Sequence, residues 1–147
     1  MKVKAELSVG KSNYYRHLVE EITKDIKKNT DKEVTVMELE DGYEYKKKML
    51  YKKKPVYIKM KIGPLMHDKF FIVRYETDET ECMYSYDFVT ENEKDYVIYT
   101  EENDYKEKTF LNKFGTLKRN VQQKSIQKRM LNNIELTETY IKNHSIK

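Results

Sequence analysis

PVYIKMKI, residues 55–62, is the clearest strand pattern in this chain of 147 residues. Apolar side chains occupy every second position from Val56 to Ile62, and Tyr57 and two lysines fill the positions between them. A period of two is typical of a β-strand with one buried face and one wet face. Gly63-Pro64 follows directly and predicts that the strand ends there.

Three further strands are predicted downstream of this stretch. Residues 69–77 carry aromatic or β-branched side chains on both faces, which is typical of a central strand covered on two sides. Residues 81–88 alternate again, and residues 96–100 follow a polar turn and are predicted to return beside them. Because sequential strands usually pair, a meander is the simplest topology.

The residues upstream predict a strand, a helix and a hairpin. Residues 3–9 alternate as a strand, and Ser12 is a suitable cap for an amphipathic helix that closes at residues 29–31. Residues 34–39 are rich in strand-forming side chains, and Asp41-Gly42 is a strong hairpin signal before a further strand. The second strand of this hairpin is predicted over residues 43–51.

The end of the chain predicts one long helix. From about Thr109 the strand pattern stops, and apolar side chains recur at roughly helical spacing from Leu117 to Ile141. A curved sheet and an amphipathic helix must bury their apolar faces against each other, so we expect the helix across the concave side. The predicted fold is a single α+β domain spanning residues 1–147. It is a curved antiparallel β-sheet of about six to seven strands wrapped around a long C-terminal helix, with an N-terminal strand and helix.

Three segments also resemble a known family. MKVKAELSVGKSNYYRHLVEEI at the start, DGYEY at residues 41–45 and LKRNVQQKSIQKR at residues 117–129 are similar to an uncharacterised Gram-positive bacterial family catalogued as a domain of unknown function. The element order resembles the helix-grip architecture of START-like and Bet v 1-like domains, which often enclose an apolar cavity. This resemblance implies a START-like fold. It implies no activity and assigns no role to any residue.

Composition and charge narrow the function classes. A net charge of +4, from 29 basic and 25 acidic residues, is too mild to predict a nucleic-acid partner. Acidic side chains gather between residues 76 and 105 and basic ones between 106 and 130, so we expect the final helix near the acidic strand ends. The single cysteine, Cys82, and the lack of a signal-like or membrane-spanning apolar run favour a cytoplasmic protein with no membrane partner.

No motif in the chain names a reaction. The histidines His17, His67 and His144 have no metal-ligand spacing, and four glycines provide no phosphate-binding loop. The sequence therefore predicts no metal, no cofactor and no catalytic residue. A non-enzymatic protein is favoured, and an enzyme stays open, with His67-Asp68 as its acid–base candidate.

The densest basic cluster allows two interpretations. KKKMLYKKK, residues 46–54, has six lysines around an apolar and aromatic centre, and it could grip phosphates while Tyr51 stacks on a base. Lysines at the edge of a sheet also prevent pairing with another chain. The second interpretation is favoured because arginine, which dominates base and phosphate recognition, is scarce.

The aromatic rows lead to the main functional hypothesis, a module that binds a small, largely apolar molecule between the sheet and the last helix. Alternatives are a homodimer with a filled core, paired through a sheet edge or through the last helix, and an enzyme that uses the same cavity. The inward face of each strand is predicted only to within one register step. The predicted cavity lining consists of Ile58, Met60, Phe71, Val73, Tyr84, Tyr86 and Phe88 on the sheet, with Cys82 in the same row, and Leu117 and Val121 on the helix.

Overall fold

The computed structural model describes residues 1–105 and 116–144, with the side chains of Tyr51, Tyr105 and residues 116–123 left aside. Two long helices and a shorter one accompany the strands of a single sheet. In chain order the elements are β1 (Lys2–Glu6), α1 (Lys11–Thr30), α2 (Val36–Glu40), β2 (Tyr43–Tyr51), β3 (Lys54–Met66), β4 (Phe70–Glu76), β5 (Thr80–Glu91), β6 (Lys94–Tyr105) and α3 (Thr116–His144).

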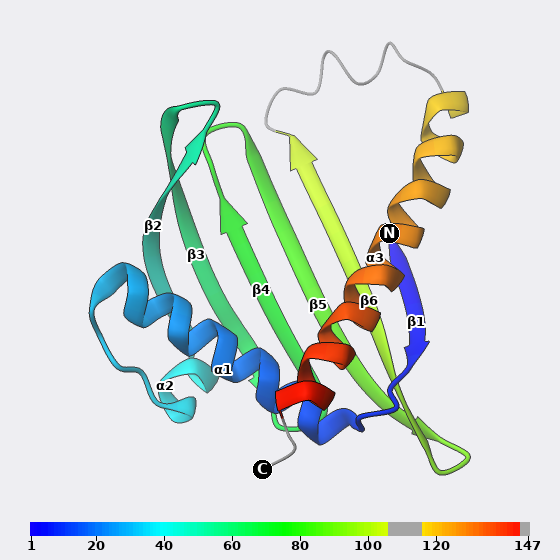
Figure 1. Cartoon of the computed structure of the whole chain (residues 1–147). Coiled ribbons are helices and arrows are strands. Elements are labelled where there is room, and N and C mark those ends of the chain that lie inside the picture. The colour runs from blue at the N-terminus through cyan, green and yellow to red at the C-terminus, as the bar shows by residue number, and fades with distance from the viewer. Residues whose placement is uncertain (106–115, 145–147) are drawn as a thin grey trace.

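The sheet is antiparallel and has six strands in the order β1-β6-β5-β4-β3-β2. Strands β2 to β6 form the predicted meander, and β1 adds to β6 at the far edge. The sheet curves, and α1 and α3 lie on the same side of it, with α1 in front of β2 to β4 and α3 toward β6 and β1 (Figure 1). This arrangement confirms the predicted α+β helix-grip architecture.

The predicted strand over residues 34–39 is wrong, because this segment forms the short helix α2. Thr35 caps the helix: its Oγ1 accepts a hydrogen bond from the backbone N–H of Glu38 at 3.3 Å. Leu39 is fully buried, whereas Met37 is 76% exposed, so the segment buries one residue per turn instead of one strand face. This local cap outweighs the strand propensity of the valines. Asp41-Gly42 accordingly links α2 to β2 and is not a hairpin turn.

The strand that opens at residue 55 does not end at Gly63-Pro64. β3 runs on to Met66, and its pairing with β4 shifts register between Ile62 and Leu65. A β-bulge of this kind keeps a strand going while it redirects the side chains. As a result Leu65 faces the core with only 5% exposure and pairs with Phe71.

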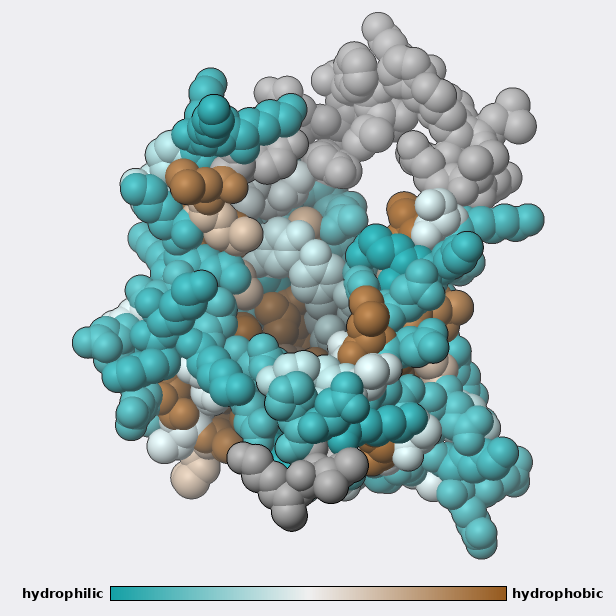
Figure 2. Space-filling model, in the orientation of Figure 1, coloured by the Kyte–Doolittle hydropathy of each residue, from teal (hydrophilic) through white to brown (hydrophobic). Residues whose placement is uncertain are grey.

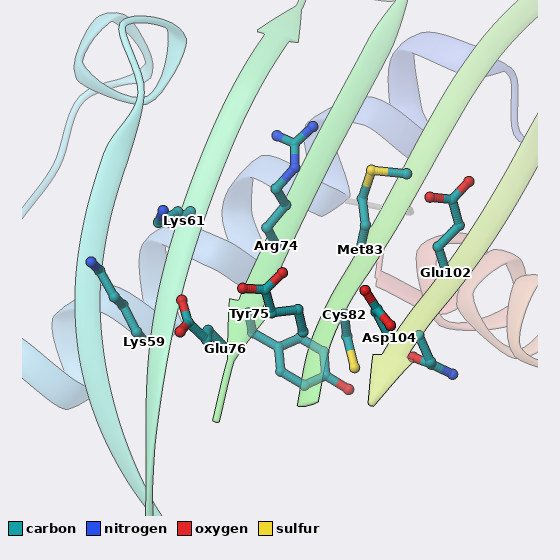
Figure 3. Close-up of a pocket in the computed structure, with 11 residues that line it drawn as sticks. Lys59, Lys61, Arg74, Tyr75, Glu76, Cys82, Met83, Glu102 and Asp104 are labelled. Carbon is teal, nitrogen blue, oxygen red and sulfur yellow. The ribbon is translucent and has the colours of Figure 1, made fainter. Parts of the chain in front are cut away.

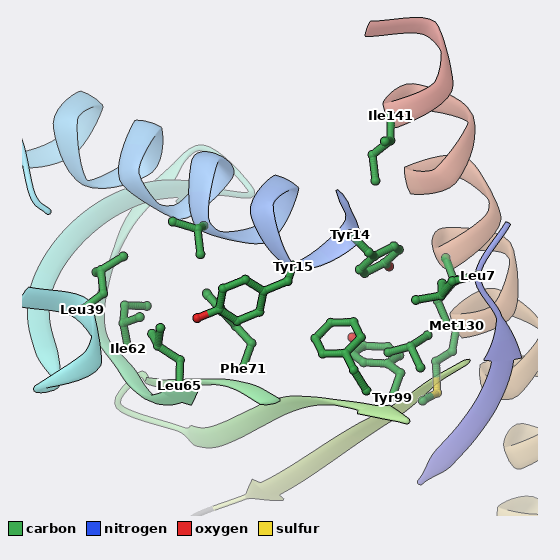
Figure 4. Close-up of a cluster of buried hydrophobic side chains, with 14 of the residues drawn as sticks. Leu7, Tyr14, Tyr15, Leu39, Ile62, Leu65, Phe71, Tyr99, Met130 and Ile141 are labelled. Atoms are coloured by element: carbon green, nitrogen blue, oxygen red, sulfur yellow. The ribbon is translucent and has the colours of Figure 1, made fainter. Parts of the chain in front are cut away.

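The main core lies between the concave side of the sheet and the two long helices (Figure 4). Tyr15 of α1 packs against Phe71 with ring centroids 6.1 Å apart, and Tyr14 lies 6.1 Å from Phe88. From α3, Met130 and Ile141 enter the same cluster. Both helices thus face the side of the sheet on which the predicted cavity residues must lie.

Candidate ligand-binding face of the sheet

The seven cavity residues predicted on the sheet share one face. Strand register places Val73 opposite Tyr84 and Phe71 opposite Tyr86, and side chains at paired positions point to the same side. Since Phe71 contacts Tyr15 of α1, this side is the concave, helix-facing one. All seven predicted residues therefore lie on the concave face, a point that the sequence left open, and their role in binding stays a prediction. The two predicted helix residues, Leu117 and Val121, lie outside the described side chains.

Burial divides these residues into two groups. Met60, Phe71, Phe88 and Cys82 are buried, which makes them part of the packed core. Ile58, Val73, Tyr84 and Tyr86 are only partly buried, so solvent reaches the concave face at these positions. The space-filling view shows the corresponding hollow between the atoms of α1 and those of α3, with pale and brown side chains inside it and hydrophilic ones around it (Figure 2).

Four tyrosines on this face form a continuous aromatic surface, the tyrosine cluster of Tyr75, Tyr84, Tyr86 and Tyr99. The rings of Tyr86 and Tyr99, which are direct cross-strand partners, are stacked with centroids 4.8 Å apart. Tyr84 and Tyr99 are stacked at 6.3 Å, and Tyr75 and Tyr84 lie 5.4 Å apart. The hydroxyl groups of Tyr75 and Tyr84 are hydrogen-bonded to each other at 2.8 Å. Aromatic pairs of this kind contribute about 0.5–1.5 kcal/mol each beyond the area they bury.

One carboxylate is buried beside the tyrosine cluster. The side chain of Glu101 is 6% exposed, and its Oε1 accepts a hydrogen bond from the Tyr99 hydroxyl at 2.6 Å. Its Oε2 accepts another from Nη2 of Arg129 on α3, also at 2.6 Å. A buried carboxylate needs such partners because its desolvation is costly. The pair therefore joins α3 to the sheet at the margin of the hollow.

Sequence reasoning did not single out Tyr75, Tyr99, Glu101 or Arg129. The period of two in β6 could have indicated Glu101 in part, because it places this residue on the same face as Val97 and Tyr99. From sequence alone, a glutamate near the end of a strand is expected to be exposed to solvent. Only the position of α3, which brings the guanidinium of Arg129 to it, shows that Glu101 is buried and paired.

The tyrosine cluster consists of protonated phenols at neutral pH. Burial raises the pKa of Tyr75, Tyr84, Tyr86 and Tyr99, and in Tyr99 the neighbouring Tyr86 and the carboxylate of Glu101 raise it further. Burial also raises the pKa of Tyr14, at the edge of the cluster, to about 12. The cluster therefore offers ring faces and neutral hydroxyl groups, a set suited to hydrogen bonding rather than to proton abstraction.

The acid–base candidate His67-Asp68 lies elsewhere, in the turn between β3 and β4. The side chain of His67 is 73% exposed, and its Nε2 is 3.5 Å from Oδ2 of Asp68. It borders a separate recess of about 360 Å³ with Ser12, Arg16 and Val36, next to the edge of the Tyr15 ring. An enzyme that uses the concave hollow would therefore lack its proposed histidine.

The lysine cluster of residues 46–54 does not form one patch. β2 is an edge strand, and the register places Lys46 opposite Lys59 on the outer face but Lys47 opposite Ile58 on the concave one. There Nζ of Lys47 is 3.2 Å from the carboxylate of Asp25 on α1. The edge position supports the interpretation that these lysines protect the sheet from pairing with another chain.

The described residues show no metal-binding cluster and no membrane-spanning helix. Among them no group of three or more histidine, cysteine, aspartate or glutamate side chains could hold a metal ion. None of the helices in the described part of the chain has an apolar stretch long enough to cross a lipid bilayer. The one cysteine, Cys82, is a free thiol buried in the sheet.

Comparison with solved structures shows the fold. TTHA0849 from Thermus thermophilus is 14% identical, with a TM-score of 0.62 over 99% of this chain and 98% of that one. Ara h 8.0201, a Bet v 1-like protein, is 9% identical with a TM-score of 0.59 over 98% and 97% of the two chains. Mll3558 from Rhizobium loti is 8% identical with a TM-score of 0.58 over 94% of each. At these identities the likeness concerns the fold alone.

Comparison with curated proteins finds no match. A family model described as "Domain of unknown function (DUF3284)" matches residues 1–118. That segment covers β1 to β6 and the start of α3, and with them the tyrosine cluster and the outer face of the sheet. The chain therefore belongs to the DUF3284 family, with a Bet v 1-like helix-grip fold.

Proposed function

We propose that the protein binds a small, largely apolar molecule in the hollow on the concave face of the sheet, between α1 and α3. The observation that carries this proposal is the tyrosine cluster, in which Tyr75, Tyr84 and Tyr86 stay partly exposed on the helix-facing side of the sheet while Tyr99 is buried beneath them. Ligand sites typically combine an apolar, aromatic lining with a few polar groups that fix orientation.

The cluster also defines the character of the ligand. The partly exposed rings of Tyr84 and Tyr86, stacked on the buried ring of Tyr99, offer an aromatic surface, which favours a planar or ring-containing body. The hydroxyl groups of Tyr75 and Tyr84 already satisfy one hydrogen bond between them and have capacity for another. A ligand with one hydroxyl or carbonyl group on an apolar frame fits this combination.

The experiment has two parts, both on the full chain. Native mass spectrometry after mild purification, followed by solvent extraction, identifies any molecule that co-purifies. Titration with the fluorescent apolar probe 1-anilinonaphthalene-8-sulfonate then tests the location of binding. Val73→Trp, in the hollow, is expected to weaken probe binding at least tenfold by occupying space.

The matched control is Tyr57→Trp, which introduces the same residue on the opposite face of the sheet, where Tyr57 is 67% exposed. It is expected to bind the probe as the unmodified chain does. The proposal is wrong if the unmodified chain shows no saturable binding and no co-purified molecule, or if the two tryptophan variants bind alike.

A further inference from the structure

The outer face of the sheet, which neither helix covers, carries a groove of about 530 Å³ (Figure 3). Its side chains are sorted by charge. Lys59, Lys61 and Arg74 lie on β3 and β4, and Glu81, Glu102 and Asp104 lie on β5 and β6. Glu76 on β4 lies within the basic half, opposite Lys59, and Met83 separates the two halves in the middle of the groove.

Strand register brings like charges directly opposite one another on this face. Lys61 pairs with Arg74, and Glu81 pairs with Asp104 on one side and with Glu76 on the other. Like charges at directly opposed positions of an antiparallel sheet are destabilising. Among the described residues, moreover, Lys61, Glu81, Glu102 and Asp104 have no ion-pair partner within 4.0 Å. Lys59 is paired with Glu44 at 3.7 Å, so the charges that the described residues leave without an ion pair are Lys61 and Arg74 on the basic half and the three acids on the other.

We propose that this face is the contact surface between two copies of the chain. A two-fold axis parallel to the strands, running between β4 and β5, turns the basic half of one copy onto the acidic half of the other. The same rotation places the acidic half of the first copy on the basic half of the second. Both contacts are therefore equivalent, as an isologous interface requires. Met83 of each copy then lies near the axis, where an apolar side chain is buried most completely.

The charge arrangement favours a second copy over other partners. A nucleic acid would be repelled by the acidic half, and a uniformly acidic or basic protein would meet like charge over half of the groove. A second copy carries both blocks at the same spacing, so each block meets one of opposite sign. Face-to-face packing of two sheets with nearly aligned strands is also a common geometry. Because the contact is rich in charge, it is expected to weaken as salt is added.

This inference is independent of the proposed ligand site, because the two occupy opposite faces of the sheet. Docking through the outer face leaves the concave hollow open. Failure of one proposal therefore leaves the other standing, and the two are measured separately, by oligomeric state and by ligand or probe binding.

The test is sedimentation equilibrium of the full chain at about 0.05 M and about 1 M salt, conditions that span weak and nearly complete screening. Two charge-reversed variants accompany it, Lys61→Glu/Arg74→Glu, with an acidic face, and Glu102→Lys/Asp104→Lys, with a basic one. Each is expected to self-associate at least tenfold more weakly than the unmodified chain. An equimolar mixture of the two is expected to form a heterodimer.

The control is Lys28→Glu/Lys32→Glu, which makes the same change in net charge as Lys61→Glu/Arg74→Glu on two exposed residues, one in the last turn of α1 and one just after it. It is expected to dimerise as the unmodified chain does. Circular dichroism confirms folding, and the milder Arg74→Gln replaces any variant that does not fold. The proposal is overturned if the chain is monomeric at low salt and high protein concentration, if the reversed faces leave the dimer intact, or if the mixture stays monomeric.

Discussion

Arg129 of α3 donates a hydrogen bond to Glu101 of β6, with 2.6 Å between its Nη2 and Oε2 of the carboxylate. The two side chains differ in environment, since the arginine is 52% exposed and the glutamate only 6%. The contact joins the last helix to the sheet at the point where the tyrosine cluster begins, through the hydrogen bond from Tyr99 to the same carboxylate. The carboxylate also raises the pKa of the Arg129 guanidinium, chiefly through this hydrogen bond.

Arg129→Met is expected to lower the free energy of unfolding by about 1–3 kcal/mol, because it leaves a buried carboxylate with one partner fewer. Urea denaturation followed by circular dichroism measures the change. The double variant Arg129→Met/Glu101→Gln is the control, and its loss should be smaller than that of Arg129→Met, because the buried charge is gone. Equal stability of Arg129→Met and the unmodified chain would contradict a structural role for the pair.

Alkaline pH is expected to destabilise the protein through the tyrosine cluster. Burial raises the pKa of Tyr86 and Tyr99 in the folded chain, while in the unfolded chain it stays near 10. Below about pH 10 both states keep their protons and stability is unaffected. Above it the unfolded state ionises first, so stability is lost as pH rises, by up to about 1.4 kcal/mol per pH unit for each tyrosine.

Urea midpoints measured between about pH 8 and pH 11 test this slope, and Tyr86→Phe is expected to reduce it. The absorbance of phenolate gives a second readout on the folded chain. The prediction is contradicted if all 13 tyrosines ionise together near pH 10 while the chain stays folded, because the buried phenols would then have the pKa of exposed ones.

Acid is expected to weaken the contact between the two long helices. The ring of His17 on α1 lies 5.2 Å from that of Tyr140 on α3, and burial lowers its pKa. Nearby Glu20 and Glu21 oppose this shift, whereas Lys24 and His144 add to it. As pH falls below 6.5, His17 is protonated in the unfolded chain before it is protonated in the folded one. The free energy of unfolding therefore decreases as pH falls.

His17→Gln is expected to flatten the dependence of the unfolding free energy on pH in the range just below 6.5. The measurement is the urea midpoint as a function of pH, with Lys28→Gln on the exposed side of the same helix as control. A His17 resonance that titrates in the folded chain as a free histidine does would refute the prediction.

Tyr15→Phe is expected to leave stability unchanged or to raise it. Tyr15 is 2% exposed, and its hydroxyl has no hydrogen-bond partner among the described residues. An unsatisfied buried hydroxyl costs about 1–3 kcal/mol, and phenylalanine removes it while the ring contact with Phe71 stays. Thermal denaturation followed by circular dichroism compares the two chains. A loss above about 1 kcal/mol would show that the hydroxyl is hydrogen-bonded in solution.

Local pattern alone determined much of this fold. The alternation from Val56 to Ile62 and from Cys82 to Phe88 predicted the strands and which side chains share a face, because a side-chain period of two leaves only two choices of inward face. The helical spacing in α1 and α3 likewise predicted the helices that cover the sheet. At Thr35 the strand propensity of the segment is outweighed by a helix-capping hydrogen bond, and the predicted strand is the helix α2.

Relationships between strands and helices were decided only by the tertiary structure. Alternation predicts which residues of a strand share a face, but register alone brings Lys61 opposite Arg74 and Glu81 opposite Asp104. Packing alone separates the buried Phe71 from the partly exposed Tyr84 on the same face. The pairing of Glu101 with Arg129 joins residues 28 positions apart. Pattern along the chain determines which way a side chain points, whereas its partner depends on long-range packing that no local period encodes.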